Sequence, residues 1–189
     1  MKNIAIFASG SGTNAENIAR YFESHSHIHV KLILSNKPDA YVLERAKKLN
    51  ISTLTFTKKE LYQRDKILSV LEDNKIDLIV LAGFLLLIPT YLIEAYQGKI
   101  INIHPALLPN YGGKGMYGDR VHRAVLDNQE QESGITIHYV NEHYDEGNII
   151  FQKKCPVYSD DTPDSLAERI HQLEHEYYPR VIENLLNQE

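Results

Sequence analysis

Residues 4–14 read IAIFASGSGTN, an apolar run of strand length followed at once by a turn that holds two glycines. A continuous apolar run of this length is typical of a strand that is buried on both faces of a parallel sheet. Gly10 and Gly12 permit a tight turn and a close approach of a ligand to the backbone, and a helix is expected over Ala15–Tyr21. This stretch therefore predicts a strand–loop–helix unit whose helix N-terminus presents its amides to an anion.

Two neighbouring features narrow the anion that this loop would bind. The dinucleotide-binding fingerprint usually has a third glycine where Ala15 stands, so only its looser version matches. The next expected strand, Val30–Leu34, ends in Ser35–Lys37 without the acidic residue that holds a ribose diol in a dinucleotide fold. A phosphate monoester therefore fits better than NAD, and a glycine turn without any ligand is the alternative. The predicted phosphate-binding residues are Gly10, Ser11, Gly12, Thr13 and Asn14.

The alternation of strand and helix continues along the chain. The pattern predicts helices over Tyr41–Leu49, Lys58–Asn74 and Pro89–Tyr96, and strands over Ser52–Thr57, Ile76–Gly83 and Ile100–His104. It then predicts a helix over Asp119–Leu126, a hairpin of Ser133–Val140 and Ile149–Val157, and a helix from Pro163 to about Leu186. We therefore expect an α/β, Rossmann-like, mainly parallel sheet with helices on both faces, an antiparallel hairpin after the central strands and a long C-terminal helix.

Length and composition limit the class of protein. With 189 residues, 43% of them hydrophobic, the chain is expected to form one domain over residues 1–189. A net charge of −5 argues against general binding to nucleic acid or anionic membranes. The lone Cys155 cannot form an intramolecular disulfide and lies in no metal-ligand pattern, so we expect a cytoplasmic protein without a metal. No apolar run reaches the ~18 residues that a membrane span requires.

Asn102 and His104 are the candidate catalytic pair. They alternate with apolar residues at the end of the strand Ile100–His104, and Pro105 then ends the strand. Residues two apart in a strand point the same way, so an amide and an imidazole should lie side by side where the backbone leaves the sheet. This arrangement suits acyl chemistry, although two hydrogen-bonded residues at a strand end would show the same pattern.

Three loops are further candidates for the site. The apolar run Phe84–Pro89 continues past its strand and is either a lip over a cleft or core packing under the next helix. Asn110–Gly118 holds four glycines in nine residues and is expected to be a surface loop or flap with Lys114 solvated. Asp145 lies in the bend of the hairpin, where an aspartate normally serves backbone hydrogen bonding.

Five segments together resemble the phosphoribosylglycinamide formyltransferase family, the folate-dependent enzymes of purine synthesis. The segments are Gly10–Asn14, Ser35–Lys37 with Leu43–Ala46, Leu81–Phe84, Asn102–Pro109 and Asp145–Gly147. The similarity spans essentially the whole chain. It implies a phosphate-binding half over about residues 1–100 and a folate-binding and catalytic half over about residues 101–189.

The resemblance implies the transfer of a formyl group from the co-substrate 10-formyltetrahydrofolate to the amino group of 5-phosphoribosylglycinamide in de novo purine synthesis. It implies catalytic roles for Asn102, His104 and Asp145, and a role for Glu174 in holding the ribose hydroxyls. It also implies a folate pocket lined by the backbone of Leu85, Leu86, Leu87, Ile88, Val140, Asn141 and Tyr144. The expected partners are these small molecules alone, with the protein a monomer or a homodimer.

The chemistry of the residues agrees with such a transfer. The reaction passes through a tetrahedral oxyanion, for which the Asn102 side-chain amide or a protonated His104 can be the hydrogen-bond donor. The attacking nitrogen must also lose a proton, which Asp145 can accept directly or through a water. The same carboxylate would favour the protonated form of His104.

The chain departs from the family pattern at three places, and several alternatives are open. Ala106 stands where a serine is common, the loop Gly112–Gly118 is longer than usual, and Leu86 occupies a lip position that can be basic. A methionyl-tRNA formyltransferase or a formyltetrahydrofolate deformylase would need a further domain, so neither is expected. A sugar-nucleotide formyltransferase is the nearest enzyme alternative, and a non-catalytic nucleotide-binding module is the alternative of another class.

Overall fold

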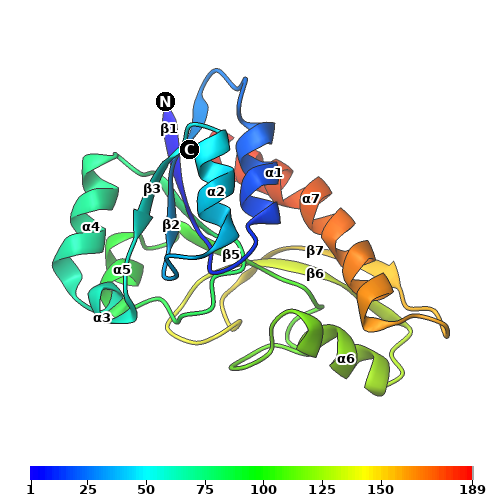
Figure 1. Ribbon diagram of the computed structural model, residues 1–189. Coiled ribbons are helices and arrows are strands. Elements are labelled where there is room, and N and C mark those ends of the chain that lie inside the picture. The colour runs from blue at the N-terminus through cyan, green and yellow to red at the C-terminus, as the bar shows by residue number, and fades with distance from the viewer. Residues whose placement is uncertain (189) are drawn as a thin grey trace.

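The computed structural model describes residues 1–188, and one seven-stranded sheet runs through it in the order β3-β2-β1-β4-β5-β6-β7 (Figure 1). The strands are β1 Lys2–Phe7, β2 Ile28–Ser35, β3 Ser52–Thr55, β4 Leu78–Leu81, β5 Ile100–His104, β6 Glu132–Tyr139 and β7 Ile149–Pro156. β1 to β5 are parallel, while β6 pairs antiparallel with both β5 and β7. The expected mainly parallel sheet with a following antiparallel hairpin is confirmed.

Helices cover both faces of the sheet, as the sequence predicts. They are α1 Thr13–Tyr21, α2 Tyr41–Lys48, α3 Lys58–Leu61, α4 Arg64–Asp73, α5 Thr90–Ala95, α6 Asp119–Asp127 and α7 Pro163–Asn187. Alternate residues of β1 serve two cores: Ile4 and Ile6 pack with residues of α1, α2 and α7, while Ala5 and Phe7 pack with residues of α3, α4 and α5. The central strands are apolar throughout because both of their faces are buried.

The prediction of a single helix over Lys58–Asn74 is wrong, because the helix is interrupted between α3, which ends at Leu61, and α4, which begins at Arg64. The hydroxyl of Tyr62 donates a hydrogen bond of 3.1 Å to the carbonyl of Leu87, and the Tyr91 hydroxyl donates one of 2.7 Å to the carbonyl of Leu61. These contacts fasten the end of α3 to the segment after β4. Tertiary hydrogen bonds therefore override the helical periodicity at this point.

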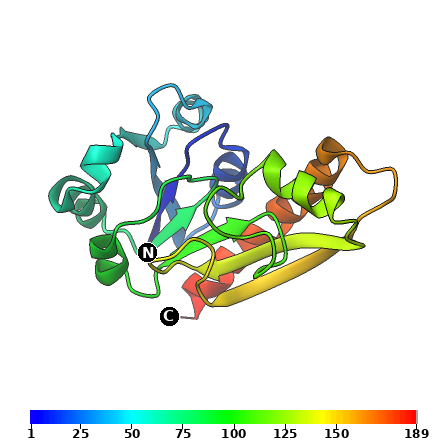
Figure 2. The same cartoon turned by 90° about the horizontal axis from the view of Figure 1, so that it is seen from below.

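The C-terminal helix α7 crosses the sheet beside α1 and along the β6–β7 hairpin (Figure 2). A capping box of Thr162 and Ser165 starts it, with Pro163 at its first position. The fully buried Tyr178 donates its hydroxyl to the carbonyl of Leu81 at 2.9 Å and lies 3.4 Å from the carbonyl of Ile101. One side chain of α7 thus contacts the backbone of both central strands.

The topology gathers three loops at one edge of the sheet. The chain leaves β1 toward β2 and later returns to β4 on the other side of β1, so the strand order reverses there. Ligands bind at such a reversal, beyond the carboxyl ends of the parallel strands. The segments after β1, β4 and β5 all begin at this edge.

We predict that Tyr178→Phe lowers the free energy of unfolding by about 1–2 kcal/mol, because it removes a buried hydrogen bond without creating a cavity. Urea denaturation followed by circular dichroism measures this change. Tyr177→Phe is the matched control, since Tyr177 is only partly buried and contributes its ring, stacked on Phe151. An equal loss in both variants would contradict the role assigned to the Tyr178 hydroxyl.

Candidate active site

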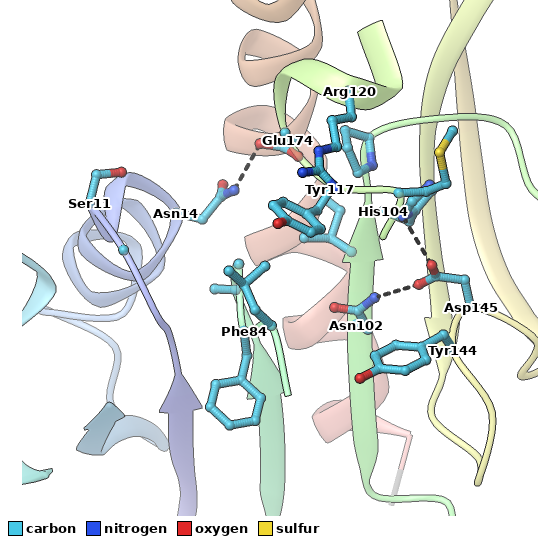
Figure 3. Close-up of a pocket in the computed structure, with 18 of the residues that line it drawn as sticks. Ser11, Asn14, Phe84, Asn102, His104, Tyr117, Arg120, Tyr144, Asp145 and Glu174 are labelled. Carbon is cyan, nitrogen blue, oxygen red and sulfur yellow. Dashed lines mark hydrogen bonds and ion pairs between the residues drawn. The ribbon is translucent and has the colours of Figure 1, made fainter. Parts of the chain in front are cut away.

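A cavity of about 560 Å³ opens at the carboxyl edge of the sheet (Figure 3). Its walls come from the loops after β1, β4 and β5, the start of α6, the bend of the hairpin and one face of α7. All of the predicted phosphate-binding residues and all three predicted catalytic residues line it. The structure therefore brings together residues that lie up to 164 positions apart in the chain, from Gly10 to Glu174.

The glycine loop is held tightly against α2. Gly12 has φ 75° at the N-terminal cap of α1, and a Cβ there would lie 2.8 Å from the Cα of Val42. The amide of Val42 also donates a hydrogen bond of 3.2 Å to the carbonyl of Gly10. Only glycine fits this backbone, which leaves the first amides of α1 directed at the cavity as an anion site.

Glu174 lies beside this loop on α7. Asn14 donates its side-chain amide to Glu174 Oε2 at 2.8 Å, which links the start of α1 to α7. Burial raises the pKa of Glu174, since the residue is only 6% exposed, and the Asn14 hydrogen bond only partly offsets this effect. The Asn14 Oδ1 atom is buried without a hydrogen-bond partner among the described residues. Both residues line the cavity beside the glycine loop.

His104, the last residue of β5, is 3% exposed. Its Nε2 lies 2.7 Å from the carbonyl oxygen of Tyr111, which can only accept, so this nitrogen carries a proton. Its Nδ1 lies 3.5 Å from Asp145 Oδ2. Burial lowers the pKa of His104 below its ordinary value, although the Asp145 charge and the Tyr111 carbonyl both act to raise it.

Asp145 is in the left-handed backbone region, with φ 58°, and its side chain is 11% exposed. Its Oδ2 accepts a hydrogen bond of 2.9 Å from the amide of Gly113, and its Oδ1 lies 3.6 Å from His138 Nε2. Burial raises the pKa of Asp145, but His138, His104 and the Gly113 amide together outweigh it. The pKa therefore lies below the usual range, and the carboxylate is ionised at neutral pH.

His138 supports the site and was not predicted from the sequence. It is paired with Asn102 across β5 and β6, and its Nε2 lies 3.1 Å from Asn102 Nδ2. Its Nδ1 lies 2.8 Å from the carbonyl of Tyr139, which places a proton on Nδ1; Nε2 accepts from Asn102 in the neutral ring and can donate to Asp145 Oδ1 only when the ring is doubly protonated. The strand register could have indicated His138, because Asn102 faces it directly.

The second hydrogen of the Asn102 amide is directed at Asp145 Oδ1, 3.4 Å away. Both hydrogens are thus engaged, and the Asn102 oxygen points into the cavity (Figure 3). In this arrangement the free polar atom of Asn102 is an acceptor rather than the donor considered from the sequence.

A narrower cleft shares Asn102, Tyr144 and Asp145 with the cavity. Among the predicted folate-binding residues, it is lined by Leu86, Leu87, Ile88, Val140 and Tyr144. Leu85 lines the larger cavity instead, and Asn141 lines neither space but accepts a hydrogen bond from the amide of His143. Phe84, Ile88 and their neighbours also pack in the core, so the apolar run is both lip and core.

Four lining residues were not singled out from the sequence: Arg120, His122, His138 and His171. They come from α6, β6 and α7, whose positions around the cavity depend on the tertiary fold. Phe84, Met116 and Tyr117 also line the cavity, and they lie in two of the loops that the sequence offered as candidates. Within residues 1–188, no helix is long and apolar enough to cross a membrane, and no three His, Cys, Asp or Glu side chains form a group suited to a metal ion.

Comparisons with known proteins agree on one family. The Formyl transferase family matches residues 2–182. The chain is 41% identical over 187 residues to the chloroplastic phosphoribosylglycinamide formyltransferase of Arabidopsis thaliana, covering 96% of this chain but only 64% of that protein. It is 40% identical to the phosphoribosylglycinamide formyltransferase of Bacillus subtilis (strain 168), covering 98% and 95%. The crystal structure of glycinamide ribonucleotide transformylase 1 from Geobacillus kaustophilus superposes with a TM-score of 0.89 at 39% identity, covering 98% and 99%.

We predict that Asp145→Asn moves the titration of His104 to lower pH. The neutral amide removes the larger of the two contributions that raise the His104 pKa and leaves burial unopposed by a charge. Proton–nitrogen correlation NMR of the imidazoles measures the shift, with His104→Gln used for assignment. Asp160 is an exposed carboxylate, so Asp160→Asn is the control and should leave the His104 titration unchanged. An equal His104 pKa in the native protein, Asp145→Asn and Asp160→Asn would contradict an electrostatic interaction between Asp145 and His104.

Proposed function

The chain belongs to the formyl transferase family, and from this membership we propose that it is a phosphoribosylglycinamide formyltransferase of de novo purine synthesis. It would transfer the formyl group of 10-formyltetrahydrofolate to the amino group of 5-phosphoribosylglycinamide, giving the N-formyl product and tetrahydrofolate. The observation that carries the proposal is the cluster of Asn102, His104 and Asp145 in one cavity with the glycine loop Gly10–Asn14. The names of the bacterial relatives, which this chain matches over nearly their whole length, support it.

The acceptor fits the wider end of the cavity. A phosphate would bind the backbone amides of the loop and the N-terminus of α1, where the helix dipole favours an anion. The ribose hydroxyls would bind Glu174, whose carboxyl faces the cavity beside Asn14. Residues from both halves of the chain would therefore bind the acceptor. The expected division at about residue 100 would then separate groups of strands and not the two ligand sites.

The folate fits the narrower cleft. A pteridine ring is flat and carries polar edges, and this cleft is lined by the apolar residues 86–88 and Val140 together with His143 and Tyr144. Tyr144 lines both spaces. The formyl group at the junction would therefore lie next to Asn102 and Asp145, which also line both spaces.

His104 is the donor that we assign to the oxyanion. Attack of the amine forms the new C–N bond and moves an electron pair onto the formyl oxygen, and the later break of the bond to folate N10 reverses this shift. The Nε2 proton of His104 is held by the Tyr111 carbonyl, so the available donor is the Nδ1 proton, which only the imidazolium carries. Because burial lowers the His104 pKa, the imidazolium is the less populated form at neutral pH, and the developing oxyanion and the Asp145 carboxylate, 3.5 Å from Nδ1, would stabilise it in the intermediate.

Asn102 and Asp145 act on the attacking nitrogen. The Asn102 oxygen is an acceptor directed at the cavity and can orient an N–H of the amine (Figure 3). Asp145 is ionised and partly open to solvent, so it can take the proton that the nitrogen loses, directly or through a water, for delivery to the departing folate nitrogen.

We also propose that residues 1–189 act as one domain in the cytoplasm, as a monomer or homodimer. The continuous sheet supports one domain, and the free, buried Cys155 is compatible with a reducing compartment.

The reaction is tested by following tetrahydrofolate release with and without 5-phosphoribosylglycinamide. We expect release only when this acceptor is present, with one N-formyl product formed for each tetrahydrofolate. Formate and tetrahydrofolate released without an amine would identify a hydrolase. Faster transfer to a nucleotide-linked amino sugar would identify the sugar-nucleotide alternative.

Asp145→Asn should lower kcat by at least ~10²-fold, the low end of a general acid–base contribution, while the KM values change little. Asparagine can keep the left-handed turn and accept the Gly113 hydrogen bond, so the melting temperature should be nearly unchanged. Steady-state kinetics with Asp160→Asn as the control measures the effect. Full activity in Asp145→Asn would return this residue to a purely structural role.

A further inference from the structure

This inference rests on the proposed function. The proposed acceptor carries a phosphate, and the glycine loop that would bind it has no positively charged side chain to balance that charge. A phosphate monoester carries roughly −1.5 to −2 charges at neutral pH, and the lining already contains the acidic residues Asp145 and Glu174. The backbone amides of the glycine loop bear no net charge. Among the lining residues, only Lys114 and Arg120 carry a permanent positive charge, and both belong to the segment between β5 and the body of α6.

Arg120 is the better placed of these two cations. It is the second residue of α6, and its guanidinium carbon lies 5.2 Å from the centre of the Tyr117 ring. In Figure 3 both residues lie at the Glu174 end of the cavity, away from Tyr144. Lys114 is exposed like Arg120, but it lies between Gly113 and Gly115 on the loop and stacks on no aromatic ring among the described residues.

Arg120 also lacks a counter-ion. No carboxylate in residues 1–188 lies within ion-pair distance of it, whereas Arg123, one turn further along α6, pairs with Asp119 at 2.5 Å. An arginine that lines the cavity and is stacked on an aromatic ring, without a protein carboxylate of its own, has its guanidinium hydrogens free for a ligand.

We propose that Arg120 binds the phosphate of the acceptor across the cavity from the loop Gly10–Asn14. The planar guanidinium offers two parallel N–H donors to two phosphate oxygens, which a point charge such as Lys114 cannot match in geometry. Tyr117 restricts the rotamers of Arg120, so less conformational entropy is lost when the phosphate binds.

The segment between β5 and α6, which carries Tyr117 and leads to Arg120, also forms hydrogen bonds with the proposed catalytic residues. The amide of Gly113 donates to Asp145, and the carbonyl of Tyr111 accepts from His104. A phosphate held by Arg120 therefore fixes the far end of a loop whose near end positions the catalytic pair. This connects the acceptor's phosphate to the chemistry at its amine.

Kinetics with two acceptors separates a phosphate contact from a structural effect. Arg120→Gln should raise the KM for 5-phosphoribosylglycinamide by about 10- to 100-fold, equivalent to about 1.4–2.8 kcal/mol, with the KM for 10-formyltetrahydrofolate unchanged. The corresponding riboside, which lacks the phosphate, should be used equally poorly by Arg120→Gln and the native protein. Arg123→Gln is the matched control and should resemble the native protein with both acceptors. Equal losses of kcat/KM on both acceptors in Arg120→Gln would overturn the proposal.

Calorimetric binding of ribose 5-phosphate tests the contact without any turnover. Affinity at least tenfold weaker in Arg120→Gln than in the native protein and Arg123→Gln supports the contact. This result would stand even if the native protein failed to formylate 5-phosphoribosylglycinamide, which would refute the proposed function alone. Equal affinity in all three proteins would overturn the role of Arg120.

Discussion

The carboxylate of Asp145 is the interaction on which the rest of the site depends. It lies within 3.6 Å of groups from β5, β6 and the glycine-rich loop: the side chains of His104, Asn102 and His138, and the amide of Gly113. An ionised carboxylate that is mostly buried needs such partners, because burial alone would neutralise it. The same charge therefore organises three segments and is the base in the proposed transfer.

The strand order of the sheet brings these three segments together. β5 ends between a parallel neighbour, β4, and an antiparallel one, β6, so its last residues share one cavity with the glycine loop Gly10–Asn14 and with the bend of the hairpin. The Tyr178 hydroxyl contacts the backbone of β4 and β5, and this joins α7 to the strands that carry the site. Glu174 is one turn before Tyr178 on the same helix, so the position of the proposed ribose ligand follows from core packing.

The fold was largely accessible from the sequence, because its elements follow from local patterns of period 2 and period 3.6. The break at Leu61–Tyr62 was not, since it depends on hydrogen bonds to residues 25 to 30 positions away. Asn102, His104 and the glycine loop stood out because each combines a special residue with a strand end. His138 and Arg120 did not, because their importance lies in what faces them across space rather than in their neighbours along the chain.

Main-chain atoms set the proton positions of both histidines in the site. The carbonyl of Tyr111 accepts from His104, and that of Tyr139 accepts from His138. A carbonyl is present whatever side chain the residue bears, so both tautomers can be inherited unchanged while positions 111 and 139 diverge in evolution. Distant relatives are then expected to keep the same two tautomers with different residues at these two places, where a comparison of aligned side chains alone would find nothing in common.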